Sequence, residues 1–462
     1  MPAFRMIDAK LPDFGIPETR PELDRSIYTE RYSALNRARR NAGLDALIVY
    51  ADREHTANLT YLTGFDPRFE EALLIIVPDA TPTLLAGPEN LGRAAASAIE
   101  VEARLYPPFG LLGQDRTKTP DLAEVLRNAG IAKNQRVGVL GWKYFGAHEA
   151  AKPESWLEAP SYIVDTLRQV VGADGRVVNA NALLMHPVTG LRAVNEIVQI
   201  AQFEFGAGAC SEAVKALIRN VRPGMSEFEA VQHMRLGVLP HSCHTMLSSG
   251  DRLVGLNSPS GRKLGRGDPM TTAVGYWGGL SSRMGWLVED ASELSEGVRD
   301  YVEKLAGPYF ACAAEWYETI GIGVTGGELD ALARRHLDNP FFKLVLNPGH
   351  LIHIDEWMNT QVYPGSTEPF LSGQCVQVDI IPAAGAPYYG ANIEDGIALL
   401  DAQGRDELKS SFPDVWNRTE ARRAFMADVL GIRLKPEVLP LSNLAGAMPP
   451  YWLAPDRIVS KA

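Results

Sequence analysis

In the first part of the chain, the spacing of apolar and polar positions is in some segments that of a helix and in others that of a strand. Residues 28–42 have helical spacing and end before Gly43, and the apolar run 46–50 then has the length of a buried strand. The same order continues with expected strands at 71–77, 83–86 and 136–140 and an expected helix at 91–99, separated by glycine and proline. This pattern predicts an α/β layer domain over residues 1–185.

This order of elements ends near residue 185. One long amphipathic segment with few helix-breaking residues, 192–218, follows. Further helices are expected at 226–237, 293–319, 327–337 and 418–430, and strands at 243–256, 268–277, 375–382 and 391–400. Strands separated by long helices predict an α+β domain over residues 186–462. Its apolar tail, LPLSNLAGAMPPYWLAP, is expected to pack on the body of the protein or on a neighbouring subunit.

Composition excludes several classes of partner. Hydrophobic residues make up 46% of the 462 residues and charged residues 22%, as in ordinary globular proteins. The formal net charge is −11 and basic residues form no dense run, which excludes nucleic acid and anionic membranes as expected partners. The N-terminus lacks the apolar core of a signal peptide and no stretch reaches the roughly 18 apolar residues of a membrane span, so we expect a cytoplasmic protein.

Several phrases along the chain together resemble the pita-bread hydrolases, which include creatinase, prolidase and aminopeptidase P. In chain order they are GLDALIVYADREHTANLTYLTGF, LRAVNEIVQIAQFEF, VRPGMSE, SSGDRLVGLNSP, GRGDPMTTAVG, NPGH, LSGQCVQVDIIP and ANIEDGIAL. The resemblance covers residues 30–405. It implies a creatinase-like N-terminal α/β domain (1–185) and a C-terminal pita-bread catalytic domain (186–462), commonly in a homodimer.

The resemblance also implies where a metal site would lie. Metal-dependent members of this family resemble one another in five ligands: two aspartates, a histidine and two glutamates. The matching positions keep a ligand type at His350, Asp379 and Glu394, whereas the two aspartate positions hold Ala273 and Leu280. Catalytic or metal-binding roles are therefore expected for His350, Asp379 and Glu394.

Substrate-binding candidates come from the helper positions of the family and from nearby aromatic residues. Asn257 stands where creatinase-like members resemble one another in a histidine, and Trp357 stands at a second helper position. His353 could reach part of the space near Trp357, and Tyr389 could line a pocket. The segment 276–283, which contains the second of these two aspartate positions, Leu280, looks like a shortened loop.

The chemistry of the remaining residues disfavours a two-metal centre. Two divalent cations need bridging carboxylates, and Asp379 and Glu394 supply only two negative charges. One Mn, Fe or Zn ion on His350 and these two carboxylates remains open. Without metal, two neighbouring carboxylates repel, so one keeps its proton, which creates an acid and a base able to activate water.

These expectations favour a creatinase-like hydrolase that cleaves an amide or amidine C–N bond of a small molecule with one metal ion or none. One alternative is a metal-dependent Xaa-Pro aminopeptidase or dipeptidase acting on short peptides. Another is a non-catalytic scaffold that binds peptides or proteins, in which the three residues are satisfied polar remnants. The retention of three ionisable residues argues against the scaffold, since apolar side chains would fill a relaxed site at lower cost.

Overall fold

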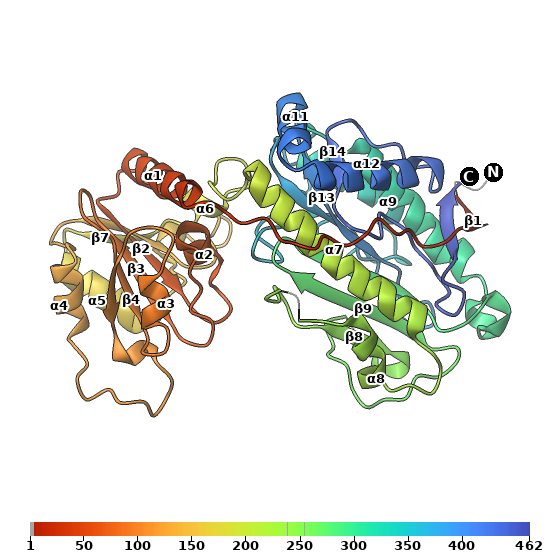
Figure 1. The fold of residues 1–462 in the computed structure, drawn as a ribbon, viewed down its shortest axis with the longest axis horizontal. Coiled ribbons are helices and arrows are strands. Elements are labelled where there is room, and N and C mark those ends of the chain that lie inside the picture. The colour runs from red at the N-terminus through yellow and green to blue at the C-terminus, as the bar shows by residue number, and fades with distance from the viewer. Residues whose placement is uncertain (1–3, 238, 254) are drawn as a thin grey trace. The chain divides into compact units, whose positions relative to one another are not determined.

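The computed structural model describes residues 4–237, 239–253 and 255–462. In this part of the chain the backbone forms two compact units (Figure 1). The N-terminal unit is Leu23–Ala193, and the C-terminal unit combines Val194–Ala462 with the described residues up to Glu22. The observed division differs in two ways from the boundary expected between residues 185 and 186. The N-terminal unit extends to Ala193, and the first residues of the chain pack with the C-terminal unit.

The N-terminal unit is an α/β layer domain around a buried sheet. Its strand order is β5-β4-β3-β2-β6-β7, with parallel pairing of β2 with β6, of β6 with β7 and of β4 with β5. The strands are β2 (Ala46–Ala51), β3 (Ala72–Ile76), β4 (Thr83–Ala86), β5 (Glu102–Leu105), β6 (Arg136–Leu140) and β7 (Arg176–Asn179). The helices are α1 (Arg25–Asn41), α2 (Ala57–Thr63), α3 (Leu91–Ala95), α4 (Leu122–Asn128), α5 (Ser161–Val171) and α6 (Ala182–Met185). Every residue of β2, β3 and β4 is buried, which explains their continuous apolar sequences.

The C-terminal unit is built on an antiparallel sheet with the order β11-β12-β13-β10-β9-β8, and β14 also pairs with β13. The strands are β8 (Met246–Ser249), β9 (Pro269–Tyr276), β10 (Gly279–Trp286), β11 (His350–Leu351), β12 (Cys375–Asp379), β13 (Ile393–Leu399) and β14 (Val438–Pro440). The helices are α7 (Ile197–Asn220), α8 (Glu227–Val231), α9 (Gly307–Thr319), α10 (Gly326–Leu337), α11 (Ala402–Ser411) and α12 (Pro413–Asp428). With the N-terminal unit, this arrangement confirms the predicted combination of an α/β and an α+β domain.

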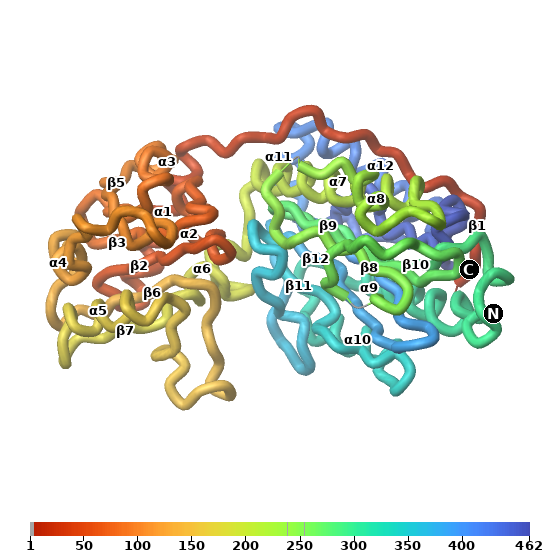
Figure 2. The backbone as a smooth tube through the Cα atoms, turned by 90° about the horizontal axis from the view of Figure 1, so that it is seen from below, coloured from red at the N-terminus to blue at the C-terminus, as the bar shows by residue number. Residues whose placement is uncertain are grey.

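An N-terminal arm crosses the C-terminal unit and explains the difference in domain division. Figure 2 follows this arm, in red, to β1 (Phe4–Asp8) beside the C-terminus. There β1 pairs antiparallel with the final strand, β15 (Arg457–Lys461). Along the way Lys215 and Arg219 of α7 donate hydrogen bonds of 2.8 Å to the carbonyl oxygens of Pro12 and Leu11, respectively.

The segment expected as a shortened loop at 276–283 is instead the turn of a β-hairpin followed by most of β10. Gly278 occupies this turn with φ +84°, and a Cβ there would overlap the ring of Phe203 on α7. Only glycine meets both conditions without strain. All of β10 is buried, so its sequence lacks the alternation that identifies a half-exposed strand.

Of two further expectations, one is met only in part and the other agrees with the structure. The helix expected over 293–319 is a regular α-helix only from Gly307 to Thr319, since the part before it forms short 3₁₀ turns and one π turn. The apolar tail packs on the body of the C-terminal unit, as one of the two expected arrangements states. Its Trp452 is fully buried and donates its backbone N–H to the carbonyl oxygen of Trp286 at 2.8 Å. Across the described residues, no helix has the length and apolar character needed to cross a lipid bilayer.

Candidate active site

The backbone around His350 holds its imidazole at a fixed position inside the sheet. Gly349 has φ +127°, and a Cβ at this residue would lie 2.8 Å from the Trp316 ring. The Trp316 indole N–H donates a 2.7 Å hydrogen bond to the carbonyl oxygen of Pro348. The Pro-Gly pair of NPGH therefore lets the chain pass close to Trp316 before it enters β11.

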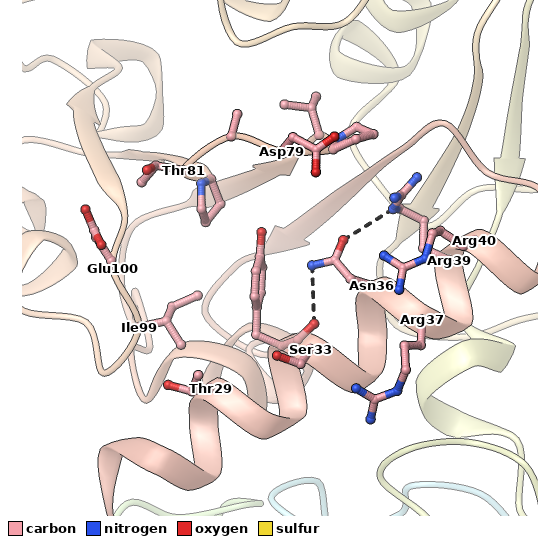
Figure 3. Close-up of a pocket in the computed structure, with 15 residues that line it drawn as sticks. Thr29, Ser33, Asn36, Arg37, Arg39, Arg40, Asp79, Thr81, Ile99 and Glu100 are labelled. Carbon is pink, nitrogen blue, oxygen red and sulfur yellow. Dashed lines mark hydrogen bonds between the residues drawn. The ribbon is translucent and has the colours of Figure 1, made fainter.

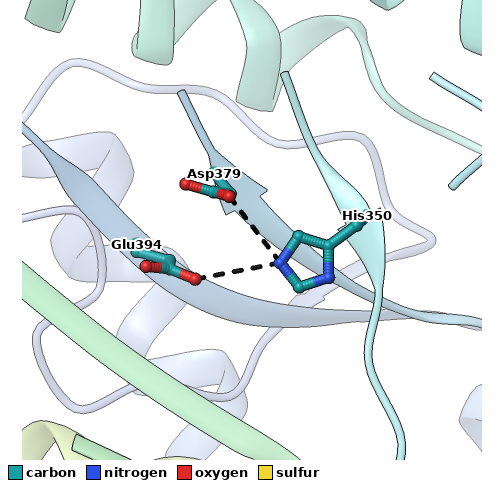
Figure 4. A group of neighbouring side chains, drawn as sticks. All are labelled: His350, Asp379 and Glu394. Carbon is teal, nitrogen blue, oxygen red and sulfur yellow. Dashed lines mark ion pairs between the residues drawn. The ribbon is translucent and has the colours of Figure 1, made fainter. Parts of the chain in front are cut away.

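Strand pairing brings the three expected catalytic residues together. His350 on β11 is the register partner of Gln377 on β12, and Asp379 at the end of β12 faces Glu394 on β13. Figure 4 shows the three side chains pointing toward one another from these strands. The Nε2 atom of His350 lies 3.9 Å from Asp379 Oδ2 and 3.8 Å from Glu394 Oε1. The potential donor atoms of all three residues lie within 4.8 Å of one another.

A third carboxylate, Glu356, also faces His350, with its Oε1 3.4 Å from Nε2. It reaches this place because the chain turns back after β11: Leu351 and Asn359 form an antiparallel bridge. The neighbouring Trp357 stacks on the imidazole, with ring centroids 4.1 Å apart and an angle of 16° between the rings. Sequence motifs predicted no role for Glu356. The only sequence feature that points to Glu356 is its place in NPGHLIHIDEW, because the bridge that brings this residue to His350 is a tertiary contact.

Burial and mutual repulsion control the protonation of the carboxylates. Burial raises the pKa of Asp379 well above its usual range, and the negative charges of Glu394 and Glu356 raise it further. Burial likewise raises the pKa of Glu394, followed by the charges of Glu356 and Asp395, while Arg283 acts in the opposite direction. The pair therefore holds at least one proton near neutral pH when no cation is present.

Two buried polar atoms of this group lack hydrogen-bond partners among the described residues: His350 Nε2 and Asp379 Oδ1. The other imidazole nitrogen, Nδ1, lies 3.2 Å from the carbonyl oxygen of Leu351. A carbonyl oxygen only accepts, so this contact places the proton of a neutral imidazole on Nδ1. The Nε2 lone pair then faces carboxylate oxygens, and this arrangement is stable only with a proton or another cation between them.

The carboxylates of this group border a cavity of about 530 Å³ in the C-terminal unit, whereas His350 is not among the residues that line it. Asp379, Glu394 and Glu356 line it, as do three of the four expected substrate-binding residues: Asn257, Trp357 and Tyr389.

The fourth expected binding residue, His353, is absent from this lining. It is fully buried, and its ring packs edge-on against Phe203 at 5.1 Å. The expectation that His353 binds substrate is therefore not supported, because the chain direction after β11 turns its ring toward α7. Asn257 has a local role as well, since its amide donates a 3.0 Å hydrogen bond to the carbonyl oxygen of Arg252.

The wall where the family resemblance places two aspartates is apolar. Ala273 on β9 and Leu280 on β10 are buried and line the same cavity. The register links them to the acidic residues, because Ala273 faces Ser282 and Ser282 faces Glu394. A dinuclear metal centre does not fit this donor set, which lacks bridging carboxylates on one side. The unpartnered His350 Nε2 and Asp379 Oδ1, with Glu394, fit a single divalent ion of the Mn, Fe or Zn type.

The second acidic residue of the IEDG phrase, Asp395, has a structural role on the other face of β13. Its Oδ2 pairs with Arg283 at 2.5 Å and accepts the backbone N–H of Gly446 at 2.9 Å. The hydroxyl of Ser442 donates to its Oδ1 at 2.6 Å. Alternation along the strand thus divides the two carboxylates: Glu394 faces the cavity and Asp395 anchors the C-terminal segment.

A second hollow, of about 800 Å³, lies in the N-terminal unit between α1 and the turn that joins β3 to β4. Figure 3 shows Arg37, Arg39 and Arg40 of α1 on one side and Asp79 on the other. The Arg39 guanidinium already donates to the carbonyl oxygens of Leu44 and Asp45. This hollow holds none of the residues expected in the site.

Comparison with known proteins agrees with this architecture. The sequence profile of the creatinase/prolidase N-terminal domain matches residues 31–170, which confirms the family expected for this part of the chain. Among curated proteins, no sequence matches the chain.

Solved structures share the fold across both units. The prolidase from Thermococcus sibiricus superposes with a TM-score of 0.62 at 16% identity, over 82% of this chain and 95% of the prolidase. The Xaa-Pro dipeptidase from Bacillus anthracis gives a TM-score of 0.59 at 17% identity, over 82% of this chain and 96% of its own. For the X-Pro aminopeptidase from Thermotoga maritima the TM-score is 0.60 at 16% identity, with 80% and 95% covered. The predicted combination of a creatinase-like domain and a pita-bread domain is thereby confirmed.

Proposed function

Because residues 31–170 belong to the creatinase/prolidase N-terminal domain family and the chain shares the prolidase fold, we propose that the protein is a hydrolase of small-molecule C–N bonds. The bond is that of an amide or amidine, and His350, Asp379 and Glu394 form the reacting group. One observation carries this proposal: the Nε2 atom of a buried histidine faces two buried carboxylates that line a cavity.

The protonation of the pair suits general acid–base catalysis. Because burial and mutual repulsion raise the pKa of both Asp379 and Glu394, one group can keep its proton as a carboxylic acid while the other, once ionised, accepts a proton. The ionised partner takes a proton from water as water attacks the carbon of the C–N bond, and the acid donates its proton to the leaving nitrogen. His350, held by the Trp357 ring and by the contact of Nδ1 with Leu351, keeps Nε2 directed at both carboxyl groups.

A single divalent ion would be held by His350, Asp379 and Glu394. Such an ion, when bound, polarises the bond under attack and lowers the pKa of water. In that state Glu356, 3.4 Å from His350 Nε2 and on the cavity wall, is the remaining carboxylate able to accept a proton.

The peptidase alternative rests on the names of the structural relatives, which include Xaa-Pro dipeptidases and prolidases. It requires a metal centre built without the aspartates replaced by Ala273 and Leu280. The apolar wall at these positions favours a mononuclear or metal-free hydrolase over a dinuclear peptidase.

The proposal is tested by release of ammonia or amine from a panel of amides and amidines. Asp379→Asn and Glu394→Gln keep side-chain size and should each lower kcat/KM by about 100-fold or more. The matched control is Glu407→Gln, which makes the same charge change on the exposed face of α11. Turnover that both site variants leave intact would contradict the proposal, and tight ligand binding without turnover would favour the scaffold.

A further inference from the structure

The charges that line the cavity of the C-terminal unit have one sign. Three acidic side chains, Glu356, Asp379 and Glu394, border it, of which the Asp379–Glu394 pair keeps at least one proton while no cation is bound, and no Lys, Arg or His stands among the lining residues that the structure describes. An anionic group on a ligand would enter without a counter-charge and would meet like charges at short range. A cationic group would find partners on the wall.

The unsatisfied hydrogen-bonding groups on the lining are also of one kind, since they are acceptors. Asp379 Oδ1 has no hydrogen-bond partner among the described residues although the residue is only 5% exposed. The second acceptor without a partner is Asn392 Oδ1, which belongs to a residue that is 8% exposed.

The orientation of the Asn392 amide follows from its neighbours. The Ser282 hydroxyl donates its single proton to the carbonyl oxygen of Thr272 at 2.9 Å. It therefore accepts from the Asn392 amide nitrogen, which lies 2.6 Å away. The amide nitrogen is thus engaged, and the oxygen remains as the acceptor without a partner.

These acceptors belong to neighbouring positions on one wall. Asn392 and Glu394 are two residues apart and both line the cavity, and Asp379 is the register partner of Glu394. Much of the remaining lining is apolar and includes Leu253, Leu280, Met284, Leu346 and Ile381. A ligand that satisfies both parts needs several N–H donors at one end and an apolar body.

We propose that the substrate carries an N–H-rich cation, such as an amidinium, guanidinium or primary ammonium group, on an apolar body without a carboxylate. The cation lies against Asp379, Glu394, Glu356 and the Asn392 carbonyl, where charge-assisted hydrogen bonds form. This inference names the substrate class of the hydrolase and therefore rests on the proposed function. It also disfavours free dipeptides, whose C-terminal carboxylate finds no basic partner on this wall.

The test uses four probes that share a phenyl ring: benzamidine, benzylamine, benzamide and benzoate. Isothermal titration calorimetry on the full chain should show benzamidine and benzylamine binding at least about tenfold more tightly than benzamide, with benzoate weakest. Benzoate binding as tight as benzamidine binding would overturn the inference. So would equal affinities for benzamidine and benzamide.

A charge variant locates the cation on the wall. Glu356→Gln should weaken benzamidine binding about fivefold and leave benzamide binding within about twofold, whereas Glu407→Gln should change neither. The Glu356 side chain is 25% exposed, and the unfolding temperature of the variant checks that its replacement leaves the fold intact. An unchanged benzamidine affinity in Glu356→Gln would contradict the role of this carboxylate and with it the assigned binding wall.

Binding and turnover separate this inference from the proposed function. Cation binding without hydrolysis of any amide or amidine would support the ligand class and contradict the hydrolase. Hydrolysis confined to carboxylate-bearing substrates would support the hydrolase and overturn the ligand class.

Discussion

Asp379 and Glu394 are register partners on adjacent antiparallel strands, and both are buried beneath the same cavity. Two carboxylates in this relationship destabilise each other when both are ionised. Here the pairing of β12 with β13 in the sheet of the C-terminal unit holds the two residues side by side. The protonation of this pair should therefore affect both the stability of the protein and its binding of a metal ion.

We expect Asp379→Asn to remove a pH dependence of stability in metal-free protein. The native pKa of Asp379 lies above the usual 3.8, so between these values the native state binds more protons than the unfolded chain. The free energy of unfolding then falls as pH rises from 3.8 through the native pKa. Thermal unfolding of chelator-treated protein across this range should show a smaller decline in Asp379→Asn than in wild type. Equal slopes would contradict the prediction, and Glu407→Gln should keep the wild-type slope.

Metal content distinguishes the candidate centres. Protein expressed with added manganese, iron and zinc and purified without chelator should carry at most one tightly held ion per chain by plasma mass spectrometry. The reason is the donor set, which has three ligands and an apolar wall at Ala273 and Leu280. Any bound ion should be lost in Glu394→Ala. Two ions per chain would contradict the assignment and support a dinuclear peptidase.

The stacked ring of Trp357 should matter for catalysis more than for folding. Trp357→Ala frees the imidazole of His350 to rotate away from the carboxylates, and kcat should fall about tenfold or more. Trp357→Phe keeps an aromatic face and should recover most of this loss. A kcat that stays at the wild-type value in Trp357→Ala, with the pH profile unchanged, would show that the ring does not position His350.

Gly278 should tolerate no side chain. Gly278→Ala places a methyl group at φ +84° and against the Phe203 ring, so it should destabilise the protein by about 1–3 kcal/mol. Gly297→Ala is the control, because its Cβ would meet no atom within 4 Å and its φ is not positive. Urea unfolding compares the two variants. Equal stability would mean that the β9–β10 turn adjusts freely.

Sequence patterns predicted the fold class because it depends on local periodicity, whereas His350, Asp379 and Glu394 were proposed from the resemblance to the pita-bread hydrolases, and strand pairing places the three side chains together. The patterns missed strand β10 because Gly279–Trp286 is buried on both faces and lacks alternation. Glu356 was missed for a different reason: its contact with His350 depends on the bridge between Leu351 and Asn359, which residue spacing does not encode. His353 was placed in the pocket because it is near His350 in sequence, but the same bend of the chain turns its ring toward Phe203.

The pairing of β1 with β15 has a consequence for biogenesis. The second strand of this pair, Arg457–Lys461, is translated more than 400 residues after the first, Phe4–Asp8. During synthesis the N-terminal unit is complete long before this pair closes, so the arm must wait, unpaired, while more than 400 residues follow it. Until residue 457 has been synthesised, the edge of β1 should therefore stay exposed, and its pairing with β15 is a late step in folding of the C-terminal unit.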